Sequence, residues 1–175
     1  SRVFESTDDL DACYQRHHWI KPHFSLCCAS EMRSCQLKLS DSLDERPDEK
    51  WNKQLENMDA RIRNSKKVLI YCVEGRSRSV TVALAVLVRQ KIPIDEAWHI
   101  VKSARQKAKP NVAFACILLR LYYDDKSTKT PLGDLARSME LTFEKVQRFR
   151  SRHVKFAESK LKTFVDDRLL PSLSS

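Results

Sequence analysis

The chain has 175 residues and a mass of 20.4 kDa, and its 32 lysines and arginines against 23 aspartates and glutamates give a net charge of +9. A chain of this length buries roughly 70% of its unfolded surface, so it can hold a core without disulfides. Its 42% apolar and 31% charged residues exclude a wholly disordered or low-complexity chain. The longest apolar run, Val80 to Val88, has nine residues. A membrane-spanning helix needs about 20, so we expect no membrane span.

The start of the chain has neither the apolar stretch of a secretory signal nor an initiator methionine, and we interpret the chain as a domain of a longer protein. Six cysteines are too few for a disulfide framework, which predicts free thiols in a reducing compartment. The expected location is therefore the cytoplasm, with the nucleus as the alternative. The positive charge favours phosphate-bearing partners, but no interleaved aromatic and basic pattern indicates a nucleic-acid platform, so we expect no nucleic-acid partner.

The first third of the chain predicts two helices and two strands. Acidic residues in the first turn favour a helix from Thr7 to Trp19. The apolar stretch His23 to Ala29 and the alternating stretch Cys35 to Leu39 are typical of strands. After a polar loop at 41–47, a helix is expected from 48 to about 64, because apolar residues recur there at helical spacing: Trp51, Leu55, Met58 and Ile62.

Strand and helix patterns continue to alternate in the middle of the chain. Lys67 to Tyr71 predicts a buried strand, and Asn111 is a plausible N-cap. The apolar periodicity predicts three helices: Ser79 to Gln90, Asp95 to about Lys107, and Val112 to Tyr123. Strands that alternate with helices predict a layered α/β domain.

The last 50 residues are the more basic part of the chain, with eleven basic and six acidic side chains. Residues 126–133 form a polar linker, and residues 134–170 contain neither glycine nor proline. Apolar residues at three- and four-residue steps predict one or two helices there. We therefore expect a domain at 1–125, followed by a linker and basic amphipathic helical extension at 126–175. The helices at 134–170 would pack on this domain, on a missing domain or on a partner protein.

Glycine placement gives the strongest indication of a site. The chain has two glycines, and Gly75 lies in Tyr71-Cys-Val-Glu-Gly-Arg-Ser-Arg-Ser79, between a predicted strand and a predicted helix. Such a glycine indicates special backbone dihedrals or a close ligand. The helix N-terminus offers free amides to an anion, and Arg76 and Arg78 add guanidinium donors. A cysteine at position 72 is biased toward thiolate by these charges. The arrangement is typical of a nucleophile directed at a bound phosphate.

The spacing Cys-x5-Arg is weak evidence by itself. Cys27 and Arg33 have the same spacing, but no glycine lies between them and no helical pattern starts at Arg33. The strand–loop–helix context, and not the spacing, therefore supports a reactive Cys72. The alternative is an inert buried thiol.

The stretch from Val68 to Ala85 resembles the signature of dual-specificity phosphatases, a subfamily of the cysteine-dependent tyrosine phosphatases whose form of the signature is Gly-x-Ser-Arg-Ser. The resemblance continues through Glu96-Ala97-Trp98, Arg105 and Pro110-Asn111. The Glu-Ala-Trp and Ala-x-Pro-Asn pieces are similar to the phosphatase-like domain of the plant propyzamide-hypersensitive tubulin kinase. The resemblance implies a three-layer α/β fold with a central, mostly parallel sheet flanked by helices, and a mechanism that needs no metal and no cofactor.

The resemblance also implies the roles of individual residues. Cys72 would be the nucleophile, and Ser79 would assist its departure from the cysteinyl phosphate. The general acid would lie on an earlier loop, where Asp41 precedes Cys72 by 31 positions and Asp44 is the competitor. The phosphate would be held by the loop amides and by the Arg78 fork, that is, by Val73, Glu74, Gly75, Arg76, Ser77 and Arg78.

The implied activity is hydrolysis of phosphotyrosine and phosphoserine or phosphothreonine in a phosphoprotein substrate. Tyr71 stands where the family has histidine, so we expect a slower enzyme. The alternatives are a phospho-residue-binding module with little turnover and a phosphoinositide phosphatase, which Arg76 would favour and Glu74 would oppose. A zinc module is a weaker alternative because no Cys-x2-Cys pair occurs among the candidate ligands Cys13, His17, His18, His23, Cys27, Cys28 and Cys35.

Overall fold

The computed structural model describes residues 24–28, 53, 55, 56, 59, 60, 68–72, 74–152 and 160–174. The elements in chain order are β1 (Phe24–Cys28), β2 (Val68–Cys72), α3 (Arg78–Arg89), α4 (Ile94–Ala104), α5 (Val112–Tyr122), α6 (Leu132–Ser138), α7 (Phe143–Arg152), α8 (Lys160–Phe164), the π-helical η3 (Val165–Leu169) and α9 (Leu170–Ser174). The helix expected at 7–19 and the strand expected at 35–39 lie outside the described residues. Within the helix expected at 48–64, the five described residues are helical.

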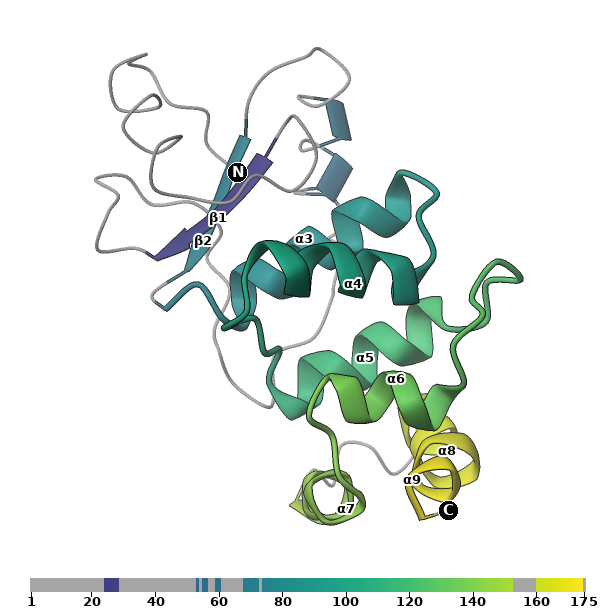
Figure 1. Cartoon of the computed structure of the whole chain (residues 1–175). Helices are drawn as coiled ribbons and strands as arrows, with labels where there is room; N and C mark the ends of the chain where they lie inside the picture. The colour runs from purple at the N-terminus through teal and green to yellow at the C-terminus, as the bar shows by residue number, and fades with distance from the viewer. Residues whose placement is uncertain are drawn as a thin grey trace.

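β1 and β2 pair in parallel, with Phe24 opposite Val68 and Cys28 opposite Cys72. Both strands lie where the sequence predicts them, and the pairing places Cys72 at the carboxyl end of β2. In open α/β sheets, ligands bind at this end of the strands. α3 begins shortly after β2 and packs against it (Figure 1).

Two helices form the centre of the core. Every residue from Ser79 to Leu87 of α3 is buried, and so is every residue from Ala113 to Leu119 of α5. A helix that is apolar on nearly all sides is stable only when other elements surround it. α3 contacts β2, α4 and α5, and one continuous cluster of buried side chains runs from Leu55 to Leu169. Trp98 belongs to this cluster, as its place in the helical pattern suggests.

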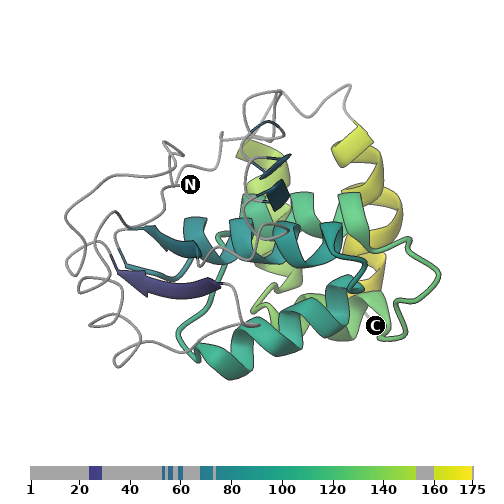
Figure 2. The same ribbon diagram turned by 90° about the horizontal axis from the view of Figure 1, so that it is seen from above.

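The C-terminal extension packs on the same core. α7 and α8 contact α5, and these helices lie at the end of the molecule opposite β1 and β2 (Figures 1 and 2). Arg168 Nη1 binds the Asp124 carboxylate at 2.8 Å, and its guanidinium lies over the rings of Tyr123 and Phe164. The buried apolar side chains of the extension include Leu135, Met139, Val146, Phe149 and Leu161. No helix among the described residues is long and apolar enough to cross a bilayer.

The extension is divided more finely than the one or two helices that the sequence predicts. α6 ends in a turn in which the Leu141 amide donates to the Ala136 carbonyl at 3.0 Å and the Glu140 amide donates to the Arg137 carbonyl at 2.9 Å. Glu140 has a φ of 62°, a left-handed conformation that ends a helix. The Thr142 hydroxyl then accepts the Lys145 amide at 3.2 Å in the first turn of α7. No glycine or proline marks this break in the sequence.

Both glycines of the chain meet a requirement of the backbone. Gly75 has a φ of 65°, which side chains other than glycine adopt at a cost. At Gly133 of α6, a Cβ atom would lie 2.5 Å from the carbonyl oxygen of Ser172. Glycine at this position therefore permits the close approach of α6 to α9.

Candidate active site

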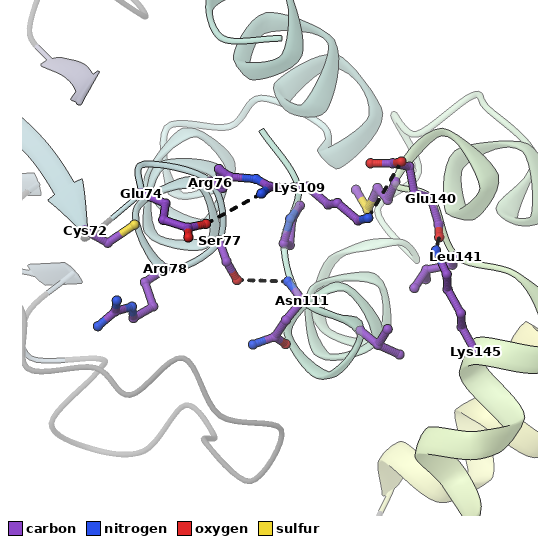
Figure 3. A pocket seen from close by; sticks show the side chains of 13 residues that line it. Cys72, Glu74, Arg76, Ser77, Arg78, Lys109, Asn111, Glu140, Leu141 and Lys145 are labelled. Atoms are coloured by element: carbon purple, nitrogen blue, oxygen red, sulfur yellow. Dashed lines mark hydrogen bonds and ion pairs between the residues drawn. The ribbon is translucent and has the colours of Figure 1, made fainter. Parts of the chain in front are cut away.

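Cys72 lies where β2 ends and the loop to α3 begins. Its half-buried side chain lines a cavity of about 510 Å³, together with Arg76, Arg78 and other residues of the loop (Figure 3). The Cys72 side chain and the N-terminal end of α3 therefore face the same cavity. A helix N-terminus is favourable for an anion because its first amides have no partner within the helix.

Hydrogen bonds around Cys72 favour the thiolate. Burial raises the pKa of Cys72, but hydrogen bonds from the Ser79 hydroxyl and from the amides of Ser79, Arg76 and Gly75 outweigh it and hold the pKa below its ordinary value. The Cys72 sulfur and the Ser79 hydroxyl oxygen are 3.2 Å apart, and in the thiolate form the hydroxyl donates. By contrast, burial raises the pKa of Cys116 in α5 to about 12. Of the two cysteines whose side chains are described, only Cys72 is biased toward a nucleophilic form.

The loop is braced from the side away from the sulfur. Arg105 Nε donates to the Gly75 carbonyl at 2.6 Å, and Arg105 Nη2 donates to the Glu74 carbonyl at 3.2 Å. The Lys109 amide donates to the Arg76 carbonyl at 2.8 Å. In a trans peptide the C=O and the following N–H point in opposite directions. Outward carbonyls at Glu74 and Gly75 therefore direct the next two amides, those of Gly75 and Arg76, toward the cavity side.

Ser77 and Asn111 join the loop to α5. The Asn111 amide donates to the Ser77 hydroxyl at 2.9 Å. The Asn111 side-chain oxygen accepts the Phe114 amide at 2.8 Å, which confirms Asn111 as the N-cap of α5. Ser77 is buried and lines the cavity. Its hydroxyl also braces the loop, because it accepts this hydrogen bond from Asn111.

The structure brings part of the predicted site together. Cys72, Glu74, Arg76, Ser77 and Arg78 line the cavity, Gly75 and Ser79 direct amides at the sulfur, and Arg76 forms an exposed ion pair with Glu74 at 3.5 Å. The side chains of three further predicted residues lie outside the described ones: Asp41, Asp44 and Val73. Tyr71 is described only as a backbone position in β2, paired with Cys27.

Sequence reasoning missed two groups of residues. Arg105 belongs to the resembling stretch, but nothing in the pattern assigned it a role. α4 ends at Ala104, before the predicted end near Lys107, because Arg105 is extended and its side chain reaches the loop. The second group comes from the extension, which contributes four lining residues that no motif indicates: Met139, Glu140, Leu141 and Lys145.

Arg105→Lys should lower kcat about 10- to 100-fold and raise the pKa of Cys72. Lysine lacks the planar fork whose Nε and Nη2 donate to the two carbonyls, and each lost hydrogen bond to a charged group costs about 1.5–3 kcal/mol. The measurement is kcat together with the pH dependence of Cys72 alkylation. Lys107→Ala, an exposed change in the same segment, serves as the control. A fall in kcat with an unchanged Cys72 pKa would contradict the bracing role.

Known proteins are similar to this chain over a stretch that includes the Cys72 site. Residues 11–124 match the family profile described as dual specificity phosphatase, catalytic domain. The chain belongs to the dual specificity phosphatase family. Dual specificity protein phosphatase PHS1 of Arabidopsis thaliana is 48% identical over 56 residues, which cover 31% of this chain and 6% of PHS1. Dual specificity phosphatase 28 of Mus musculus is 45% identical over 58 residues, which cover 33% of this chain and 36% of that protein.

Solved structures of similar proteins share the fold. Human DUSP28, crystallised as a tyrosine-to-histidine variant, aligns with a TM-score of 0.54 at 22% identity over 59% of this chain and 92% of that one. The human tyrosine phosphatase-like serine/threonine/tyrosine-interacting protein aligns with a TM-score of 0.51 at 16% identity over 60% and 94% of the two chains. These likenesses confirm the predicted dual-specificity-phosphatase-like α/β fold. The curated matches span about a third or less of those relatives' lengths.

Proposed function

We propose that this chain is a protein phosphatase that hydrolyses phosphotyrosine and phosphoserine or phosphothreonine through a cysteinyl-phosphate intermediate. The observation that carries the proposal is the convergence of the Ser79 hydroxyl and three backbone amides on the Cys72 sulfur. A thiolate at the mouth of a cradle of N–H groups combines a nucleophile with donors for phosphate oxygens. Family membership supports phosphoproteins as the substrate class.

In the first step, the Cys72 thiolate attacks phosphorus in line with the leaving oxygen, so that an S–P bond forms and a P–O bond breaks. The loop amides and the Arg78 fork would stabilise the charge on the three equatorial oxygens. In the second step, water attacks phosphorus, inorganic phosphate leaves and the Ser79 hydroxyl stabilises the departing thiolate. Because arginine and amides supply the positive charge, the proposed mechanism uses no metal and no cofactor.

Asp41 is the proposed general acid, with Asp44 as the competitor. In this proposal the strand expected at 35–39 extends a mostly parallel sheet beyond β1 and β2, and the loop after it carries the acid. The carboxyl would protonate the leaving oxygen and then accept a proton from the attacking water. Asp41→Asn should lower kcat about 100-fold and remove the alkaline limb of its pH profile, within the 10²–10⁴-fold range of acid–base catalysis. The same outcome for Asp44→Asn alone would move the role to Asp44.

The direct test is steady-state hydrolysis of p-nitrophenyl phosphate and of phosphotyrosine, phosphoserine and phosphothreonine peptides by the purified chain, between pH 5 and 8. We expect turnover of the aryl phosphate and of the peptides. Absence of turnover, together with phosphopeptide binding that Arg78→Lys weakens, would replace the enzyme with a phospho-residue-binding module.

Tyr71 is the observation that favours this second candidate. Tyrosine can donate a hydrogen bond but carries no positive charge, whereas the imidazole expected in the family favours the thiolate. One pKa unit of lost thiolate stabilisation corresponds to about 1.4 kcal/mol. The amides and Arg78 remain, so the proposal is a slower enzyme. A phosphoinositide phosphatase is the weaker alternative, because Glu74 already pairs with Arg76 and offsets its charge.

Tyr71→His should raise kcat by up to about tenfold and lower the pKa of Cys72, in proportion to the thiolate gained. The measurement is kcat for p-nitrophenyl phosphate and the pH profile of Cys72 alkylation. Tyr71→Phe is the matched control, since it removes the hydroxyl without adding an imidazole. If the histidine variant gains no activity, the residue at this position does not limit the reaction.

A further inference from the structure

The active-site cavity has a second half that belongs to the C-terminal extension. Met139, Glu140, Leu141 and Lys145 line it, and all four lie beyond residues 11–124, which match the family. Pro110 and Val112 add apolar lining. A cavity of about 510 Å³ falls within the range of pockets for whole ligands, roughly 300–1,000 Å³. A phosphate group would therefore leave much of it for neighbouring groups of the substrate.

The wall formed by the extension is held in place. Met139 and Leu141 are almost completely buried in the core, with 1% and 2% of their surface exposed. Between them, Glu140 keeps its left-handed backbone although it is not glycine, at a cost of roughly 1 kcal/mol or more. Its carbonyl accepts the Lys145 ammonium at 3.1 Å.

Lys109 connects the phosphate loop to this wall. Its backbone amide is bound to the Arg76 carbonyl, so its place relative to the cradle is fixed. Its ammonium forms an ion pair with the Glu140 carboxylate at 3.8 Å, with 38% and 52% of the two side chains exposed. Such an exposed pair contributes little stability, about 1 kcal/mol or less. An anion from a ligand can therefore replace Glu140 at Lys109.

The charges of the cavity fall into two groups. The loop after Cys72 carries Arg76 and Arg78 with Glu74, and the other side of the cavity carries Lys109 and Lys145 with Glu140 (Figure 3). Each group has two cations and one carboxylate, so each carries a net charge of +1. A ligand that complements both groups has two anionic sites, one at Cys72 and one on the extension side.

We propose that Lys109 and Lys145 form a second anion subsite, which binds an acidic side chain next to the phospho-residue of a peptide substrate. The inference rests on the proposed function, in which a phosphate group occupies the Cys72 half. The apolar lining of the cavity suits the aromatic ring and aliphatic parts of a phosphotyrosine peptide. The extension thereby determines substrate selection, and Glu140 acts as an internal competitor for Lys109.

The test compares a phosphotyrosine peptide flanked by aspartate or glutamate with the same peptide flanked by asparagine or glutamine. Kinetics are measured for the full chain, and affinities are measured by calorimetry with Cys72→Ser. Lys145→Gln should reduce the preference for the acidic peptide about fivefold, the effect of one exposed ion pair. Arg148→Gln makes the same charge change on an exposed part of α7 and should leave the preference unchanged.

Glu140→Gln removes the carboxylate that competes for Lys109, and it should therefore raise kcat/KM for the acidic peptide. A misfolded variant would lose activity and would not show this rise. Equal kcat/KM and affinity for both peptides in the wild type, or equal losses with Lys145→Gln and Arg148→Gln, would overturn the subsite. If nothing is hydrolysed but Cys72→Ser binds the acidic peptide more tightly in a Lys145-dependent way, the proposed catalysis fails and the subsite stands. A Lys145-dependent preference for a soluble inositol polyphosphate over both peptides would overturn the peptide assignment.

Discussion

Cys72→Ser is expected to lower kcat/KM for p-nitrophenyl phosphate at least about 10⁴-fold, the scale of removing a nucleophile from a catalytic unit. A serine hydroxyl is far less acidic than a thiol, and the donors that lower the pKa of Cys72 cannot ionise it near neutral pH. The cradle of amides and Arg78 remains, so the variant should still bind phosphopeptides. The measurements are steady-state kinetics and calorimetry.

Cys116→Ser is the matched control for this substitution. Cys116 is buried in α5, and burial raises the pKa of its thiol to about 12, so it has no part in the proposed chemistry. Its replacement should alter stability and leave kcat/KM per folded molecule unchanged. Residual activity of Cys72→Ser within tenfold of the wild type would rule out the cysteinyl-phosphate mechanism.

Arg78→Lys is expected to lower kcat about 10³-fold at unchanged charge, since one donor to a developing oxyanion accounts for about 10²–10³. Arg78 begins α3 and lines the same cavity as Cys72. Its planar fork can hold two equatorial oxygens, whereas an ammonium holds one. The effect should appear in kcat more than in KM, because the charge on the three oxygens changes in the transition state.

Arg152→Lys, an exposed arginine at the end of α7, provides the control and should change kcat by less than a factor of two. Inorganic phosphate should also inhibit Arg78→Lys more weakly than the wild type. If Arg78→Lys changed KM alone, Arg78 would serve ground-state binding and the proposed transition-state role would be wrong.

Local sequence patterns predicted the elements around the site. β2, α3 and α5 lie within one or two residues of the predicted bounds, because each combines an apolar pattern with a clear boundary residue such as Gly75 or Asn111. The loop glycine is left-handed, as expected for a residue placed between a strand and a helix in a glycine-poor chain. These features depend on interactions between residues close in sequence.

The features that the sequence did not predict depend on contacts between residues that lie far apart in the chain. Arg105 braces carbonyls 30 and 31 positions away, and no periodicity reports such a contact. The break at Glu140 lacks glycine and proline, so the sequence predicts fewer helices in the extension than the structure has. Periodicity showed that the extension has an apolar face but not what covers it. The packing of α7 on α5 and α9 brings Lys145 to the cavity.

The pH dependence of Cys72 alkylation by iodoacetamide, with and without inorganic phosphate, tests the central claim most directly. Mass spectrometry of the Cys72 peptide separates it from the other cysteines, and the experiment needs no turnover. Because the donors around Cys72 lower its pKa, the rate should rise and level off at a pH below that of an ordinary thiol, and phosphate should protect the residue. A profile at or above that of a free thiol, with no protection by phosphate, would contradict a thiolate held in a phosphate cradle.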